Sequence, residues 1–138
     1  MKQCVLLLAF LPAFGIAQNK LTITGKVKGV KEGQLISLTD VNRPADTLAK
    51  AKYSKGVFVL KGELKEPMIL NINMGDKKSL MTFLHNSSVK VAGDVNQLKE
   101  IKLTGSQLHN DFVDFKKTFD PLFEKLMKVN QQYQQGLR

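Results

Sequence analysis

The chain has 138 residues, of which 43% are hydrophobic and 24% are charged, and its formal net charge is +9. This length suits a single domain with a core of its own, and the composition excludes a disordered or collagen-like chain. A single cysteine excludes an internal disulfide framework.

The first 17 residues have the pattern of a secretory signal peptide. Lys2 gives a positive start, an apolar run extends to Ile16, and Gly15 and Ala17 are the small residues of a cleavage site. The run is shorter than the roughly 20 apolar residues that a membrane-spanning helix needs. We therefore expect residues 1–17 to be removed and the chain to be exported to the periplasm or cell envelope. The alternative is a first core strand or a buried helix.

The position of the cysteine limits the chemistry of the exported chain. A lipoprotein anchor needs a cysteine directly after the apolar run, whereas Cys4 stands where the run begins. Because Cys4 leaves with the leader, residues 18–138 hold no thiol. This excludes a thiol nucleophile, a disulfide, a CxxC redox motif and a cysteine metal site from the exported chain.

Residues 18–105 show the alternation of β-strands. Leu21, Ile23 and Val27 alternate with polar residues, which predicts one buried and one solvated face. Similar stretches recur, separated by turns such as the expected loop over residues 40–44. The expected strands are residues 21–28, 34–39, 47–53, 57–64, 68–74, 80–85, 88–92 and 100–103. About eight short strands without intervening helices predict a mainly β domain, an antiparallel β-sandwich or a partly open barrel.

Residues 106–138 change to a helical period. Apolar residues follow one another at alternating spacings of four and three, at Leu108, Phe112, Phe115, Phe119, Leu122, Leu126, Val129 and Tyr133. Ser106 is suited to cap this C-terminal amphipathic helix. Pro121 lies inside the pattern and removes a backbone donor, so we expect either a kinked helix or two helices that restart at Asp120.

The apolar side of this helix has two interpretations. It either packs on the sheet of its own domain or forms a docking surface for a second domain or subunit. For residues 106–119 we favour packing on the chain's own sheet, as globular helices normally do. For residues 122–137 both interpretations stay open, and the candidate docking seam is Leu122, Leu126, Val129 and Tyr133. Self-association through this helix is one form that docking takes.

The positive charge belongs to the β half, since residues 18–105 carry +7 and residues 106–138 carry +1. Nearly all these cations are lysines at outward strand positions and turns, whereas nucleic-acid sites more often combine arginine with exposed aromatics. We therefore expect no nucleic-acid partner and favour a solvated, lysine-coated sheet. The alternative is a stand-alone cell-envelope protein that binds an anionic or glycan surface through a Lys-rich face including Lys26, Lys28, Lys50 and Lys52.

Residues suited to catalysis are scarce. His85 and His109 are the two histidines, they lack the spacing of metal ligands, and both are expected at the surface or in a helix cap. No nucleophile elbow or phosphate-binding loop occurs, and no two carboxylates are paired by spacing. The sequence predicts no catalytic, cofactor-binding or metal-ligating residue, and we expect the chain not to be an enzyme.

Several short segments resemble a known type of domain when they are taken together in order. They are residues 21–29 (LTITGKVKG), 37–40 (SLTD), 56–62 (GVFVLKG), 89–94 (VKVAGD) and 103–106 (LTGS), with Phe112 and Phe115 following. This pattern resembles the DUF4369-type N-terminal domain of exported thioredoxin-like proteins of the Bacteroidetes. These are the ResA-like thiol-disulfide oxidoreductases and AhpC/TSA-type peroxidases, and the resemblance covers residues 20–135.

The resemblance implies an accessory domain that precedes a thioredoxin fold. This sequence departs from that layout because the thioredoxin domain and its cysteines are absent, so no catalytic residue carries over. We expect an exported, non-catalytic module that needs no cofactor and is not an integral membrane protein. Its expected partner is a thioredoxin-like domain in cis or in trans.

Overall fold

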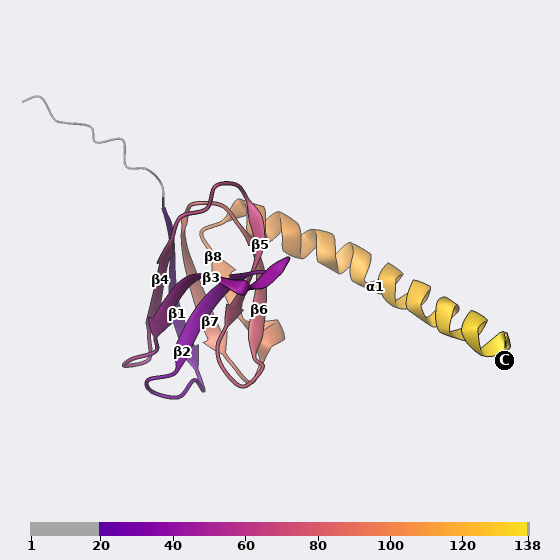
Figure 1. The fold of residues 1–138 in the computed structure, drawn as a ribbon, viewed down its shortest axis with the longest axis horizontal. Helices are drawn as coiled ribbons and strands as arrows, with labels where there is room; N and C mark the ends of the chain where they lie inside the picture. Colours follow the sequence, from indigo (N-terminus) through magenta and orange to yellow (C-terminus); the bar gives the residue numbers. More distant parts are fainter. Residues whose placement is uncertain (1–19, 138) are drawn as a thin grey trace, which may run out of the picture.

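A computed structural model describes residues 20–137, and the predicted leader, residues 1–17, lies outside the described residues. Two four-stranded sheets face each other, and one long helix leaves the sandwich and extends away from it (Figure 1). The strands are β1 (Leu21–Lys28), β2 (Leu35–Asp40), β3 (Arg43–Lys52), β4 (Phe58–Gly62), β5 (Met68–Asn73), β6 (Ser79–Leu84), β7 (Ser88–Asp94) and β8 (Lys102–Thr104). A short 3-10 turn, η1 (Leu98–Glu100), precedes β8, and the helix is α1 (Gln107–Gly136).

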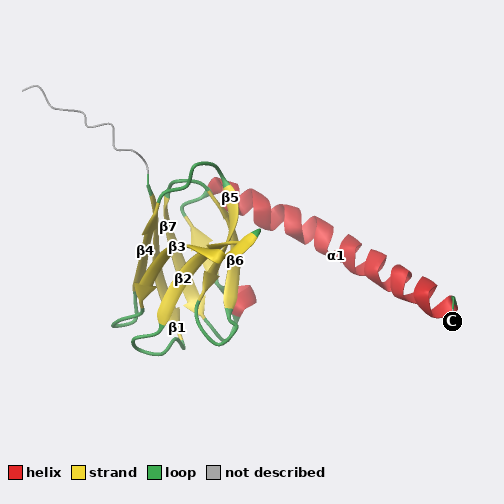
Figure 2. Cartoon of the chain, viewed as in Figure 1, coloured by secondary structure: helices red, strands yellow, loops and turns green. Residues whose placement is uncertain are grey.

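The strand order confirms the predicted sandwich. One sheet has the order β4-β1-β7-β8 and the other β3-β2-β5-β6. Figure 2 shows the strands of the sandwich in yellow and the helix in red. Five of the six strand pairings are antiparallel, while β1 and β7 run parallel, with Ile23 opposite Val89. Parallel neighbours need a long connection between them. Here the connection from β1 to β7 contains five strands, of which β4 joins the first sheet and the other four form the second sheet.

The inward positions of the alternating strands form one core between the sheets. Ile23, Leu38 and Leu70 are fully buried, each from a different strand. Phe58 of β4 is buried across Gly25 of β1, where an added Cβ would lie 2.1 Å from the phenyl ring. Gly25 therefore permits the close approach of the aromatic ring.

Polar contacts tie the two sheets together at their ends. The Tyr53 hydroxyl, just after β3, donates a 2.7 Å hydrogen bond to the carbonyl of Val27 in β1. Asn86 accepts from the backbone N–H of Leu64 at 2.8 Å and donates to its carbonyl at 2.7 Å. Both contacts join residues that are more than 20 positions apart in the sequence, so they fix connecting segments to distant parts of the chain.

The loop expected over residues 40–44 is shorter than predicted. Arg43 and Pro44 belong to β3, and a register shift in the β2–β3 pairing places Arg43 opposite Asp40. Pro44 is tolerated because β3 is an edge strand, where one side of the backbone has no strand neighbour. Asp40 accepts the N–H of Asn42 at 2.8 Å, so the carboxylate builds a turn.

The helix begins as expected and does not break. The Ser106 side chain accepts the backbone N–H of His109 at 3.1 Å, which confirms the predicted N-cap. Pro121 lies inside the single helix α1, so of the two expected arrangements the structure has one continuous helix and no second helix that restarts at Asp120. A proline removes one hydrogen bond of the ladder, and the bonded turns on both sides carry the helix across it.

Candidate interaction surface

The beginning of α1 packs at the open edge of the sandwich. The β3–β4 connection lies along one side of the two sheets, and the edge strands β6 and β8 lie along the other. His109 is buried there, and Phe112 contacts Phe83 of β6 edge to face, with ring centroids 5.9 Å apart. The first turns of the helix therefore cover an otherwise unpaired edge of the core.

The contact of the helix with the sandwich ends within its first turns, where Val113 and Lys116 are still half-buried. Every residue from 117 to 137 is exposed, including large apolar side chains such as Leu126, which is 64% exposed. The reason is one of length. A helix of 30 residues spans about 45 Å, whereas a strand of six residues spans about 20 Å. The edge of the sandwich is thus too short to cover the second half of the helix.

The expectation that residues 106–119 bury their apolar side was wrong for its last turn. Phe115 is 55% exposed and Phe119 is 39% exposed. Their rings stack on each other instead, with centroids 4.2 Å apart and an interplanar angle of 21°. The two rings therefore lie on an exposed side of α1, where they contact each other.

The four residues of the candidate docking seam are exposed together on one face. Leu122, Leu126, Val129 and Tyr133 each expose more than half of their surface. Residues three and four apart share a helix face, so this seam continues directly from Phe115 and Phe119. We call the set Phe115, Phe119, Leu122, Leu126, Val129 and Tyr133 the apolar stripe.

Two further apolar residues widen the stripe. Phe123 is 62% exposed and Met127 is 58% exposed, and the spacing analysis of the sequence left both out. Phe123 follows Leu122 and Met127 follows Leu126, so each side chain lies about 100° around the helix from its neighbour in the stripe. A search for any large apolar residue on this half of the helix, not only a seven-residue repeat, would have found them.

The stripe faces away from the sandwich. The helix residues that line the cleft against the sheets are His109, Phe112, Val113, Lys116, Lys117 and Asp120. At about 100° per residue, the centre of the stripe lies roughly a third of a turn from the centre of these positions. A partner seated on the stripe would therefore not collide with the chain's own β-sheets.

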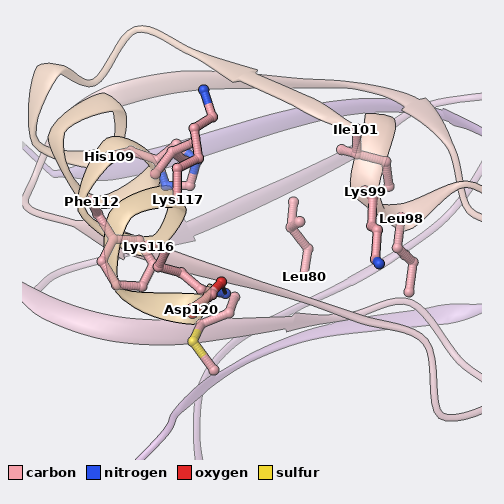
Figure 3. A pocket seen from close by; sticks show the side chains of 11 residues that line it. Leu80, Leu98, Lys99, Ile101, His109, Phe112, Lys116, Lys117 and Asp120 are labelled. Atoms are coloured by element: carbon pink, nitrogen blue, oxygen red, sulfur yellow. Dashed lines mark ion pairs between the residues drawn. The ribbon is translucent and has the colours of Figure 1, made fainter. Parts of the chain in front are cut away.

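A cleft of about 500 Å³ lies beneath the base of the helix (Figure 3). Its apolar lining includes Leu80, Met81, Leu98, Ile101 and Phe112. Its polar lining is His109, Lys99, Lys116, Lys117 and Asp120. The Lys116 amine lies 4.0 Å from an Asp120 oxygen and 6.0 Å from the centre of the Phe112 ring. The Lys116–Asp120 pair is solvent-exposed, and such pairs contribute little to stability.

For His109 the prediction from the sequence holds for the backbone and fails for the side chain. Its backbone takes part in the helix cap, as expected, but its side chain is buried beside Phe112. The buried Nδ1 has no hydrogen-bond partner among the described residues. Burial lowers the pKa of the His109 imidazole because it disfavours the charged form. His85, by contrast, is exposed at the end of β6, as predicted.

Five lysines gather on the outer face of the sheet β4-β1-β7-β8. The register pairs Thr24 with Lys90 and Thr22 with Lys61, and paired residues point to the same side of a sheet. This face, called the lysine face below, carries Lys26, Lys28, Lys61, Lys90 and Lys102. All five are exposed, and none forms an ion pair with another described residue.

The four lysines singled out in the sequence do not share one surface. Lys26 and Lys28 belong to β1, while Lys50 and Lys52 belong to β3 in the opposite sheet. Because the inner faces of the two sheets meet in the core, their outer faces point in opposite directions. Only the pairing of distant strands assembles the lysine face.

Groups that could carry chemistry are dispersed over the described part of the chain. No three His, Cys, Asp or Glu side chains within residues 20–137 are grouped to hold a metal ion. In the cleft the Nδ1 atom of His109 is buried, and the carboxylate of Asp120 lies beside the Lys116 amine. No helix among the described residues is long and apolar enough to cross a membrane.

Comparison with known proteins places the sandwich in a family. The model of a family described as "Domain of unknown function (DUF4369)" matches residues 21–112, which is well over half of the chain. The chain belongs to this family. The match ends at Phe112, within the first turns of α1, so the whole apolar stripe lies beyond it. No curated protein and no solved structure matches the chain.

Proposed function

We propose that this protein is an exported, non-catalytic accessory module that docks through α1 onto a thioredoxin-like domain, in cis or in trans. The observation that supports it is the exposure of the whole apolar stripe on a helix that the sandwich cannot cover. Exposed apolar patches of this extent mark protein or membrane contacts in soluble proteins. The thioredoxin-like partner comes from the resemblance of residues 20–135 to the N-terminal domains of exported redox proteins.

The absence of a catalytic role rests on the chemistry of the surface. A partner that meets the stripe finds aromatic and aliphatic side chains, with no nucleophile and base placed together among them. Such a surface positions another protein and does not act on a small molecule. Redox chemistry in the assembled pair would belong to the cysteines of the partner.

Site-directed photocrosslinking in the native cell tests the docking. A photoreactive phenylalanine analogue at position 122 lies in the stripe, and the same analogue at position 128 lies on the other side of the helix. We expect position 122 to crosslink a protein that carries a CxxC-containing thioredoxin fold, identified by mass spectrometry, and position 128 not to. Crosslinks from position 122 that never reach a thioredoxin-like protein would overturn the proposal.

Export rests on the order of charge, apolar run and small residues in the leader. The test is N-terminal sequencing of the protein recovered from the periplasmic or envelope fraction. A chain that begins at Gln18 supports export and cleavage after Ala17. Recovery of the chain in the cytoplasm with Met1 in place would contradict it.

The lysine face favours a second candidate function, a stand-alone envelope protein that binds an anionic or glycan surface. Heparin, a sulfated glycan, is a suitable probe. The variant Lys26→Gln/Lys90→Gln removes two charges from the lysine face, and Lys50→Gln/Lys52→Gln removes two from the opposite sheet. Weaker heparin retention of the first variant alone would support a dedicated face. Equal losses would show that net charge alone causes the retention.

A further inference from the structure

We propose that the stripe of the free protein is covered by the stripe of a second copy, with the two α1 helices paired antiparallel. The inference rests on the proposed function, because it names what occupies the docking surface until the partner displaces it. A chain that left six large apolar side chains in water would be prone to aggregate, and self-pairing removes them from solvent.

The spacing of the stripe fits a pair of helices. Its residues repeat at alternating intervals of four and three, which is the pattern of left-handed helix pairs with interlocking side chains. The stripe continues for almost the full length of the helix beyond the sandwich. A single groove on a globular partner needs fewer anchors, commonly three or four along one helix face.

The stripe is also symmetric about the position of Glu124. Phe115 and Tyr133 lie nine residues to either side, and Phe119 and Val129 lie five residues to either side. Leu122 and Leu126 lie two residues to either side. A two-fold antiparallel pair needs this property, because each residue then meets its mirror position in the second copy.

In this register the stripe residues that meet across the pair are all apolar. Phe115 meets Tyr133 of the second copy, Phe119 meets Val129, and Leu122 meets Leu126. Phe123 approaches its own equivalent beside the two-fold axis. The two Lys125 side chains approach each other on the opposite flank, where solvent and salt screen their charges.

The area available is sufficient for a stable pair. Aromatic side chains bury roughly 150–250 Å² each, and the stripe residues expose about half of their surface. With Phe123 added, the apolar surface available on each copy is on the order of 700 Å². Stable interfaces bury about 800 Å² per partner, and the stems of flanking side chains supply the remainder.

Charge selects the antiparallel arrangement. The helix is neutral over residues 107–137, with four acidic and four basic side chains, whereas residues 20–105 carry +7. A parallel pair would bring two strongly positive sandwiches side by side. An antiparallel pair puts them at opposite ends of a helix about 45 Å long, several screening lengths apart.

The test uses the full chain with Cys4→Ser, which leaves no native thiol. Light scattering over a concentration series should give the mass of two chains. Leu122→Glu/Leu126→Glu should reduce it to one chain. The control Gln131→Glu/Gln135→Glu adds the same two charges on the other side of the helix and should stay dimeric. Circular dichroism shows whether each variant keeps its helix and sheets.

Disulfide trapping tests the direction of the helices. Phe119→Cys and Val129→Cys proteins should form a mixed disulfide when combined in a glutathione redox buffer, and neither should form one efficiently alone. In the proposed register two copies of position 119 lie about 15 Å apart, too far for a bond. Efficient disulfides within each variant alone would demonstrate a parallel pair and overturn the arrangement.

A monomer at every concentration, or a monomeric control variant, would also overturn self-pairing. Neither result touches the docking proposal, which photocrosslinking to a thioredoxin-like protein decides independently. Conversely, a stable antiparallel dimer that never crosslinks such a protein would leave self-pairing in place and remove the proposed partner.

Discussion

The sandwich and the helix treat their apolar residues in opposite ways. Eighteen apolar side chains of the β half are buried in one cluster, while α1 buries none of its large apolar residues fully. Both regions have regular apolar patterns, so the regularity of the pattern does not explain why one set is buried and the other exposed. What distinguishes them is whether a second surface of matching length lies opposite, which the two sheets provide for each other and nothing in the described chain provides for the helix.

The largest effect that tests this contrast comes from the core. Phe58→Ala removes a ring that is 1% exposed, and truncations of this kind cost about 3–5 kcal/mol. Leu126→Ala deletes a side chain of the stripe and should change the unfolding free energy of the monomeric protein by less than about 0.5 kcal/mol. Urea unfolding of both variants measures the difference, in a Leu122→Glu background and at a protein concentration where light scattering gives the mass of one chain. Similar losses in the two variants would mean that the helix packs on the sandwich in solution.

The proline inside α1 sharpens the contrast, because its effect should stay within the helix. Pro121→Ala restores a backbone donor and should stabilise the surrounding turns by up to about 3 kcal/mol. Amide hydrogen exchange should slow around positions 117–125, while the urea midpoint of the β-sandwich stays unchanged. A shift of that midpoint would contradict independent behaviour of the two regions.

A smaller effect is expected where the two sheets are joined by a polar contact. Tyr53→Phe removes the 2.7 Å hydrogen bond to the Val27 carbonyl and leaves that buried oxygen without its partner. We expect a loss of about 1–3 kcal/mol in the unfolding free energy. The matched change in the stripe, Tyr133→Phe, deletes a hydroxyl from an exposed ring and should have no measurable effect on the monomer.

The smallest effect is a pH dependence at the junction between helix and sandwich. Burial lowers the pKa of His109 in the folded protein below its unfolded value, so the unfolded chain binds the proton more readily. The resulting stability is complete above the unfolded pKa and is lost as pH falls through it towards the lowered folded pKa. His109→Gln should flatten this part of the pH profile of the unfolding free energy, and His85→Gln should not. An unchanged slope in His109→Gln would contradict a buried neutral imidazole.

The strands were predictable because their signals are local. Leu21, Ile23 and Val27 alternate with polar residues, and Ser106 precedes a run with helical spacing. The parallel pairing of β1 with β7 was not predictable, since it joins segments more than 60 residues apart. The lysine face follows from that pairing, so choosing its members from the sequence combined lysines of opposite sheets.

The candidate interaction surface was predictable only in part. Leu122, Leu126, Val129 and Tyr133 were identified by their spacing, whereas Phe115 and Phe119 were expected on the chain's own sheet. All six residues have the same pattern. The direction in which α1 extends away from the sandwich decides which of them are covered (Figure 1), and no residue of the helix carries that information.

By itself the sequence determined the number and approximate bounds of the strands, the start of the helix and the placement of charge on the β half. These features depend on residues within a few positions of one another. The tertiary structure alone decided the strand order, the burial of His109 and the exposure of the stripe. Each of these depends on which distant segments meet, and on a helix of about 45 Å outreaching a sheet edge of about 20 Å.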